Sequence, residues 1–202
     1  MSGIRADFPV LADMVAPGTR VLDIGCGDGD LLDFLQRERD IDGRGMELSQ
    51  DGVNASVSRG LSVVQGDADR DLVDYPNGAF DVVILSQSLQ VLRYPRVVLN
   101  QMLRIGLHAI VSFPNFGHWR IRWDLATRGR MPLTADLPVP WYDSANIHLC
   151  TILDFMELCE TMGLHIEQGL ILDRKGNTKA IGTRPGLANL LGEQGVFLLR
   201  KR

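Results

Sequence analysis

The stretch VLDIGCGDGDLL, residues 21–32, is the strongest structural signal in this chain. An apolar run leads into glycines at positions 25, 27 and 29, and a leucine-rich run with helical spacing follows. Glycine-rich turns between a buried strand and a helix usually bind phosphate groups. This turn instead carries Asp23, Asp28 and Asp30, and no lysine or arginine occurs between Val21 and Gln36. The question is therefore which ligand suits glycines and carboxylates together.

The segments around this turn repeat an alternation of strand and helix. Apolar runs predict strands at 20–25, 43–48, 61–67, 80–86, 108–114, 164–172, 178–183 and 195–201. Helical spacing predicts helices at 31–38, 49–59, 94–106 and 151–163. Ser49 is a predicted N-cap, Thr151 with Asp154 a predicted capping box, and Gly163 a predicted helix stop. This order predicts an α/β fold with a mostly parallel sheet, whose ligands bind at the carboxyl ends of its strands.

The composition sets limits on the class of protein. The chain has 202 residues, 45% of them hydrophobic and 23% charged, which suits one domain over residues 1–202. Residues 115–150 interrupt the alternation as an aromatic insertion that contains all three tryptophans. The formal charge of −4 disfavours a nucleic-acid partner, and no apolar run is long enough to cross a membrane. Three cysteines without metal-binding spacing predict no metal site, and no signal peptide is recognisable, so we expect a cytoplasmic protein.

The spacing of the glycines narrows the choice of ligand. The pattern is G-x-G-x-G, and Asp30 stands where the dinucleotide-binding pattern G-x-G-x-x-G requires glycine. This disfavours a nicotinamide-dependent dehydrogenase. S-adenosylmethionine suits the acidic turn because it carries a sulfonium and an ammonium group and no phosphate. Glu47, at the end of the second strand, can accept hydrogen bonds from both ribose hydroxyls. Asp67 can accept one from the adenine amine, and Ala68 can donate its backbone N–H.

Longer motifs carry a family resemblance. VLDIGCGDGDLL, GMELS and QGDADRDL resemble the cofactor motifs of class I S-adenosylmethionine-dependent methyltransferases. SFPNFGHW and WYDSANIHLCT resemble the MetW family of methionine biosynthesis, and both sets together cover nearly the whole chain. The resemblance implies a Rossmann-like, doubly wound, mostly parallel seven-stranded sheet. The expected cofactor-binding residues are Asp23, Gly25, Cys26, Gly27, Glu47, Leu48, Asp67, Ala68 and Ser86.

Two functional hypotheses follow. By resemblance, the protein binds S-adenosylmethionine or S-adenosylhomocysteine and acts in methionine biosynthesis with a homoserine O-acyltransferase. The alternative is a methyltransferase that acts on a small molecule, bound under residues 115–150 near Ser86, Gln87, His118 and Tyr142. Methyl transfer needs orientation more than acid–base groups, so the missing catalytic base does not exclude this activity. No catalytic residue is assigned.

Structural alternatives stand beside the functional ones at the turn. The glycines alone fit a tight strand–helix turn as well as a binding site, and Glu47 and Asp67 favour binding. An unpaired carboxylate at Asp23, inside an apolar strand, would be costly. Asp23 therefore either anchors the loop or orients a ligand, and these roles are compatible. Cys26 suits a small filler beside the turn, with nothing nearby to activate a thiol.

The insertion leaves more alternatives open. Trp119 and Trp123 share a helix face, which predicts a small core under the insertion in preference to an acceptor pocket. The basic segment 118–130 fits a solvated face, or alternatively a surface for an acidic partner or a carboxylate-bearing substrate. His148 fits a core or turn position better than a catalytic role.

Overall fold

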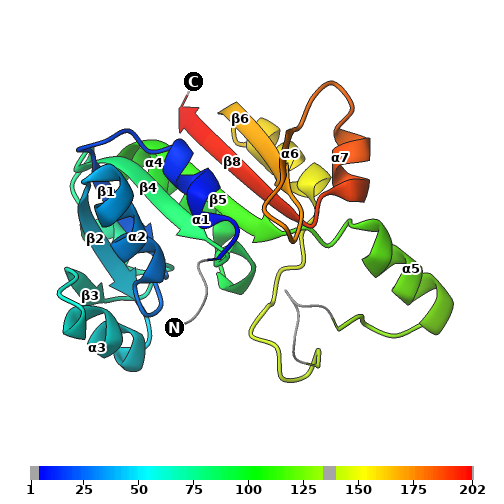
Figure 1. Ribbon diagram of the computed structural model, residues 1–202, viewed down its shortest axis with the longest axis horizontal. Helices are drawn as coiled ribbons and strands as arrows, with labels where there is room; N and C mark the ends of the chain where they lie inside the picture. Colours follow the sequence, from blue (N-terminus) through cyan, green and yellow to red (C-terminus); the bar gives the residue numbers. More distant parts are fainter. Residues whose placement is uncertain (1–4, 134–139, 202) are drawn as a thin grey trace.

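The computed structural model describes residues 5–133 and 140–201, and a twisted eight-stranded sheet forms its centre (Figure 1). The strand order is β3-β2-β1-β4-β5-β8-β6-β7. The strands are β1 (Arg20–Ile24), β2 (Asp42–Glu47), β3 (Val63–Gln65), β4 (Phe80–Ser86), β5 (Gly106–Pro114), β6 (Leu164–Leu172), β7 (Thr178–Ala180) and β8 (Gln194–Lys201). Strands β1 to β5 pair in parallel, and β8, β6 and β7 add antiparallel pairs. The predicted mostly parallel α/β fold is confirmed.

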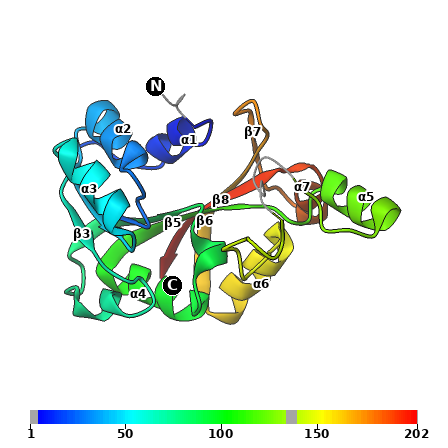
Figure 2. The ribbon, with the colours of Figure 1, turned by 90° about the horizontal axis from the view of Figure 1, so that it is seen from below.

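Helices lie on both faces of this sheet (Figure 2). They are α1 (Phe8–Asp13), α2 (Asp30–Arg39), α3 (Gln50–Ser58), α4 (Pro95–Ile105), α5 (Trp119–Arg128), α6 (Ile152–Thr161) and α7 (Pro185–Leu191), with short 3₁₀ turns η1 (Asp71–Asp74) and η2 (Leu89–Val91). Helices α1, α2 and α3 lie on one face, and α4 and α6 on the other. No helix among the described residues is long and apolar enough to cross a membrane.

Two hydrophobic cores follow from the alternation of side chains along the strands. In β4, Val82 and Ile84 pack with α1 and α2, whereas Val83 and Leu85 pack with α4 and α6. Successive residues of a strand point to opposite faces, so a continuous apolar run serves both cores at once. The uninterrupted run in β4 is therefore what a central strand covered on both faces requires.

The seven-stranded sheet that the resemblance implied is wrong, because the sheet has eight strands, as many as the apolar runs predicted. The strand predicted at 178–183 is the short edge strand β7, which pairs antiparallel with β6 and brings the count to eight. A tight turn makes this hairpin: the carboxylate of Asp173 accepts hydrogen bonds from the backbone N–H groups of Lys175 and Asn177. An aspartate that bonds the backbone two residues on is a common turn former. The hairpin thus extends the sheet by one short strand.

The predicted helix caps are confirmed. The hydroxyl of Ser49 accepts the N–H of Gly52 at the start of α3. Thr151 and Asp154 make the reciprocal hydrogen bonds of a capping box before α6, and Gly163 follows that helix with a φ of 66°. Two short helices, α1 and α7, were not predicted. Both begin with a proline in the first turn, a position proline favours.

A buried polar cluster around Asn115 fastens both ends of the insertion to the end of α7. The side-chain amide of Asn115, just after β5, donates to the carbonyls of Asn189 and Gly192, both at 2.7 Å. Its oxygen accepts the N–H groups of Gly117 and Ile152. Asn115 is fully buried, and buried amides need such partners. The beginning and end of residues 115–150 therefore meet at one fixed point.

Candidate functional site

The glycine turn lies at the carboxyl end of β1, where sequence reasoning predicted it. Gly25, Gly27 and Gly29 have φ values of 69°, 58° and 82°, in the left-handed region that favours glycine. A side chain on Gly25 would also meet the Ser88 hydroxyl at 2.8 Å. The glycines therefore allow a tight bend whose backbone N–H groups face neighbouring elements.

Glu47 joins this turn to the next strand. One carboxylate oxygen accepts the N–H of Gly27 at 2.9 Å, and the other accepts the N–H of Ser49 at 2.8 Å. Each carboxylate oxygen has two lone pairs, so Glu47 can still accept two hydrogen bonds. Its position is thus fixed by the backbone, while its capacity to bind hydroxyl groups remains.

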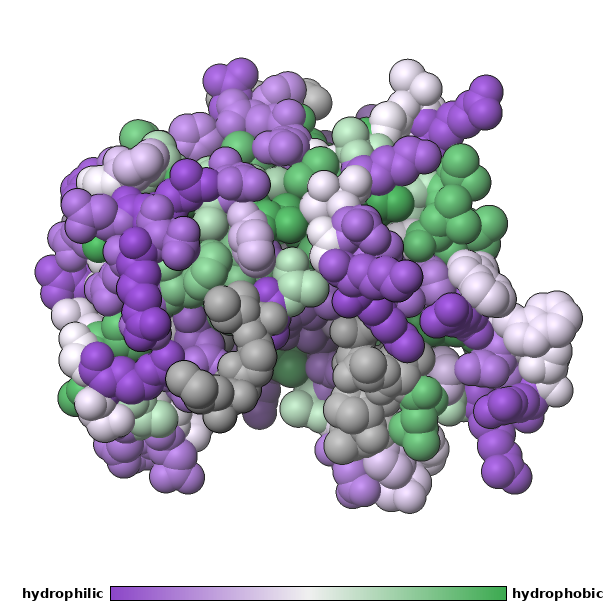
Figure 3. Space-filling view, in the orientation of Figure 1, coloured by the Kyte–Doolittle hydropathy of each residue, from purple (hydrophilic) through white to green (hydrophobic). Residues whose placement is uncertain are grey.

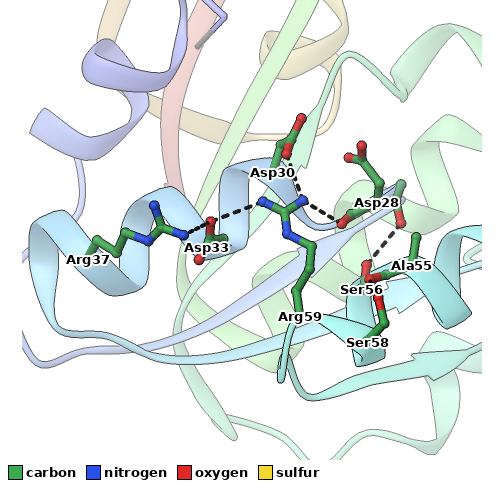
Figure 4. A network of polar contacts seen from close by, with 9 residues as sticks. Asp28, Asp30, Asp33, Arg37, Ala55, Ser56, Ser58 and Arg59 are labelled. Atoms are coloured by element: carbon green, nitrogen blue, oxygen red, sulfur yellow. Dashed lines mark hydrogen bonds and ion pairs between the residues drawn. The ribbon is translucent and has the colours of Figure 1, made fainter. Parts of the chain in front are cut away.

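Arg59, which sequence reasoning missed, neutralises the acidic turn (Figure 4). It follows α3, and its guanidinium donates to the Asp28 carbonyl at 3.0 Å, to Asp30 at 2.7 Å and to Asp33 at 3.0 Å. Arg37 adds a 2.6 Å hydrogen bond to Asp33. The hydrogen bond that Arg59 donates to Asp30 raises the pKa of Arg59. Asp30 therefore acts on a ligand only as part of an ion pair with Arg59, which lowers the net negative charge of the turn.

Asp23 lies beneath the turn and is 1% exposed. Its Oδ1 atom has no hydrogen-bond partner among the described residues. Burial raises the pKa of Asp23 to about 7; the charge of Arg5 opposes this shift, and those of Glu47 and Asp7 increase it. Of the two roles predicted for Asp23, the unpartnered oxygen favours orienting a ligand over anchoring the loop.

Arg5 is a second site residue that no sequence motif revealed. Its guanidinium donates to the hydroxyl of Ser86 at 2.8 Å, at the end of β4, and to the carboxylate of Asp7. It also lies 4.9 Å from the centre of the Phe8 ring. The one available signal was indirect: the turn has no positive charge of its own, so counter-charges had to come from elsewhere.

These groups surround a pocket of about 160 Å³ at the carboxyl end of the sheet. Its lining includes Arg5, Asp23, Gly25, Cys26, Gly27 and Ser86. Of the predicted site residues, five therefore come together here. Cys26 is buried, and burial raises its pKa to about 12, so its thiol stays protonated and suits the predicted filler role.

The remaining predicted residues lie further along the same edge of the sheet. The N–H of Gly66 donates to the Glu47 carbonyl at 3.0 Å, which places the loop with Asp67 and Ala68 beside the end of β2. The carboxylate of Asp67 accepts the N–H of Asp69 at 2.9 Å. Leu48, directly after Glu47, is 66% exposed. The predicted site thus forms one line from β4 across β1 to β3.

The insertion departs from its prediction. Trp119 and Trp123 share a face of α5 as predicted, but they are 45% and 64% exposed, so the favoured small core is wrong. His118 is buried and caps α5 by accepting the N–H of Arg120. His148 is exposed, and its backbone N–H donates to the Gln90 carbonyl. The side chain of His118 therefore has a structural role at the start of α5.

A second, larger pocket lies in the insertion. Its volume is about 880 Å³, and its lining includes Phe116, Met131, Leu133, Trp141 and Tyr142. It shares no lining residue with the pocket at the glycine turn. Among the residues that the structure describes, no group of three or more histidine, cysteine or acidic side chains could hold a metal ion.

Known proteins match both the sequence and the fold. The family model for "Methionine biosynthesis protein MetW" matches residues 5–199. The "Bifunctional methionine biosynthesis protein MetXA/MetW" of Rhodopirellula baltica is 31% identical over 179 residues, which are 84% of this chain and 29% of that protein. The "Fatty-acid O-methyltransferase" of Mycolicibacterium smegmatis is 39% identical over 95 residues, 44% of this chain and 33% of that protein. The chain thus spans about a third or less of either relative.

An S-adenosylmethionine-dependent methyltransferase from Mesorhizobium loti has a similar structure, with a TM-score of 0.69 and 18% identity. The match covers 97% of this chain and 98% of that one. At this identity the likeness concerns the fold alone, and that fold is of the class I methyltransferase type.

Proposed function

This chain belongs to the MetW family of methionine biosynthesis proteins, and on that premise we propose that it binds S-adenosylmethionine or S-adenosylhomocysteine. We further propose that it acts with a homoserine O-acyltransferase. The relative named MetXA/MetW supports this partnership, because one chain there carries both names.

The observation that carries the cofactor proposal is the buried, unpartnered Oδ1 atom of Asp23 in the pocket at the glycine turn. A buried carboxylate oxygen without a partner is costly and suits an ammonium donor. Arg5, which lines the same pocket, offers a guanidinium that suits a carboxylate. The amino-acid end of S-adenosylmethionine carries both of these groups, so the pair fits it in charge and in type of hydrogen bond.

The nucleoside end fits the rest of the line of site residues. Glu47 keeps two acceptor positions for the ribose hydroxyls, and Asp67 is an acceptor for the adenine amine. The exposed Leu48 offers an apolar surface for the adenine ring. A pocket of about 160 Å³ is smaller than the roughly 300–1,000 Å³ usual for ligands, which agrees with a cofactor that lies partly along the open edge.

A calorimetric titration with S-adenosylmethionine and S-adenosylhomocysteine tests the cofactor proposal. We expect micromolar affinity, about −8 kcal/mol, and much weaker binding by Glu47→Ala. Because Glu47 also holds the backbone, Asp67→Asn is the second variant, and its unfolding midpoint should match that of the wild type. No heat from either ligand with the folded wild-type protein would contradict the proposal.

The partnership has a separate test. The purified protein and the homoserine O-acyltransferase of the same organism should co-purify, and acyltransferase activity should change when the MetW-like protein is added. Repeating the assay with and without S-adenosylmethionine asks whether the cofactor reports the level of the pathway's product. Absence of a complex would contradict the partnership and leave cofactor binding standing.

The alternative is methyl transfer to a small molecule. The pocket of about 880 Å³ in the insertion and the partial match to a fatty-acid O-methyltransferase favour this second candidate. Labelled methyl transfer from S-adenosylmethionine to a metabolite extract would support it, provided that Asp23→Ala abolishes the transfer. If no labelled methyl group is transferred to the extract, the result favours the proposed binding role over methyl transfer.

A further inference from the structure

Helix α5 stands away from the sheet at one end of the molecule (Figures 1 and 2). Its one buried residue is Ile121. Residues advance by about 100° around a helix, so Trp119 and Trp123 lie on the side opposite to Ile121 and point away from the protein. These two tryptophans are 45% and 64% exposed. Their contact with water is unfavourable, so an exposed aromatic face of this kind indicates a surface that a partner covers.

More apolar side chains are exposed beyond the end of α5. We call six exposed apolar and aromatic side chains of residues 115–150 the insertion surface: Trp119, Trp123, Met131, Leu133, Trp141 and Tyr142. Each of them is between 40% and 72% exposed. The last four also line the pocket of about 880 Å³, so the surface is a hollow with an aromatic helix beside it.

Positive charge accompanies these apolar groups. Residues 118–130 contain four arginines and one aspartate, a formal charge of +3 in a chain whose total is −4. Asp124 is engaged by Arg128, with 3.6 Å between Oδ1 and Nε. The guanidinium of Arg120 lies over the Trp119 ring, 5.4 Å from its centre, and Arg130 lines the hollow. Arg122 instead donates to the carbonyl of Gly117 at 2.6 Å and so holds the start of α5. Figure 3 shows the resulting mixture of strongly hydrophilic and pale residues at the end of the molecule formed by α5.

We infer that the insertion surface is the docking site for the homoserine O-acyltransferase, and that it takes an acidic, partly apolar surface of that enzyme. The inference rests on the proposed partnership and adds its location. Tryptophan, tyrosine and arginine are the residues that dominate protein–protein binding energy, and here they occur together. The positive segment on an otherwise acidic protein selects an acidic partner and orients the encounter. The fixed base at Asn115 holds this surface in place for docking.

The test is a titration of the protein with the purified acyltransferase from the same organism. Trp119→Ala/Trp123→Ala and Arg128→Glu/Arg130→Glu should each weaken binding by roughly ten-fold or more. Two matched controls are Leu107→Ala, 63% exposed at the start of β5, and Arg96→Glu, exposed on α4; both should bind as the wild type does. Added salt should weaken the wild-type complex more than that of the arginine double variant. Unfolding midpoints equal to that of the wild type show that each variant is folded.

The outcomes separate the surface from the partnership. If the folded double variants bind as tightly as the wild type, the docking surface is elsewhere and the partnership stands. If the wild-type protein does not bind the acyltransferase, both proposals fall. If sedimentation shows that the wild type self-associates and the tryptophan variant does not, the surface serves a second copy of this chain and the inference is overturned.

Discussion

The glycine turn and the insertion differ in where their functional side chains point. Polar side chains at the turn are hydrogen-bonded within the protein, whereas aromatic side chains of the insertion are exposed to solvent. Around the turn, Glu47 is held by two backbone N–H groups and Arg59 by three oxygens of another element. In the insertion, the tryptophans face outward, and the fixed contacts are concentrated at its base. A region organised inward suits a small ligand, and a region that presents side chains outward suits a macromolecule. The following predictions test that contrast.

The largest effect is expected from a substitution of Asp23. The charge of its buried carboxylate lowers the free energy of unfolding, and we expect the same carboxylate to bind the cofactor. The folded protein raises the pKa of Asp23 from 3.8 to about 7, so it retains a proton that the unfolded chain releases over that range. Wild-type stability therefore falls as pH rises from about 4 to about 7, by up to roughly 4 kcal/mol. Asp23→Asn should remove that loss, so the variant is the more stable protein near pH 8 yet binds S-adenosylmethionine more weakly.

Urea denaturation near pH 5 and near pH 8, with calorimetric titration of the cofactor, measures both parts of this prediction. Asp42→Asn, an exposed acid at the start of β2, is the control, and its stability should differ from the wild type by less than about 0.5 kcal/mol. A variant at Asp23 that follows the wild-type pH dependence would show that the buried carboxylate carries no such cost.

The base of the insertion should be nearly as sensitive. Asn115→Ala removes two donated hydrogen bonds and two accepted ones, and it leaves buried carbonyl and N–H groups without partners. We expect a loss of about 3 kcal/mol in the free energy of unfolding, measured by chemical denaturation. Asn54→Ala, at an exposed position on α3, should change it by less than about 0.5 kcal/mol. Equal losses in the two variants would refute a special role for the buried amide.

Arg59 should show a smaller effect on stability, because it is about one-third exposed and its ion pairs are screened by water. Arg59→Gln should cost about 1 kcal/mol of unfolding free energy and weaken cofactor binding by several-fold. Arg59→Lys keeps the charge but loses the two-pronged geometry, so it should recover only part of the affinity. If the Arg59→Gln variant binds the cofactor as tightly as the wild-type protein does, the turn keeps its conformation without this guanidinium.

The smallest effect on the isolated protein is expected at the aromatic face of α5. Trp119→Ala/Trp123→Ala should leave unfolding free energy within about 0.5 kcal/mol of the wild type, because both side chains are already in water. Cofactor affinity should also be unchanged, since these residues share no lining with the pocket at the turn. A large loss of stability would mean that the tryptophans form the small core that the sequence predicted.

The elements that sequence reasoning found are those whose cause is local. The three glycines mark a bend that needs positive φ values, and the capping box of Thr151 and Asp154 joins residues three positions apart. The continuous apolar run of β4 contributes side chains to both hydrophobic cores, and this run is visible in the sequence. The family resemblance implied seven strands, whereas the apolar runs predicted eight, the number that the sheet has.

The chain's sequence by itself therefore determined the α/β fold, the acidic glycine turn and the order of carboxylates along one sheet edge. Only the tertiary structure decided which charges meet there. Arg59 reaches Asp30 across 29 positions and Arg5 reaches Ser86 across 81, separations at which no spacing rule applies. It also decided that Trp119 and Trp123 face water. A helix pattern shows that two side chains share a face, but whether that face is covered depends on where the rest of the fold lies.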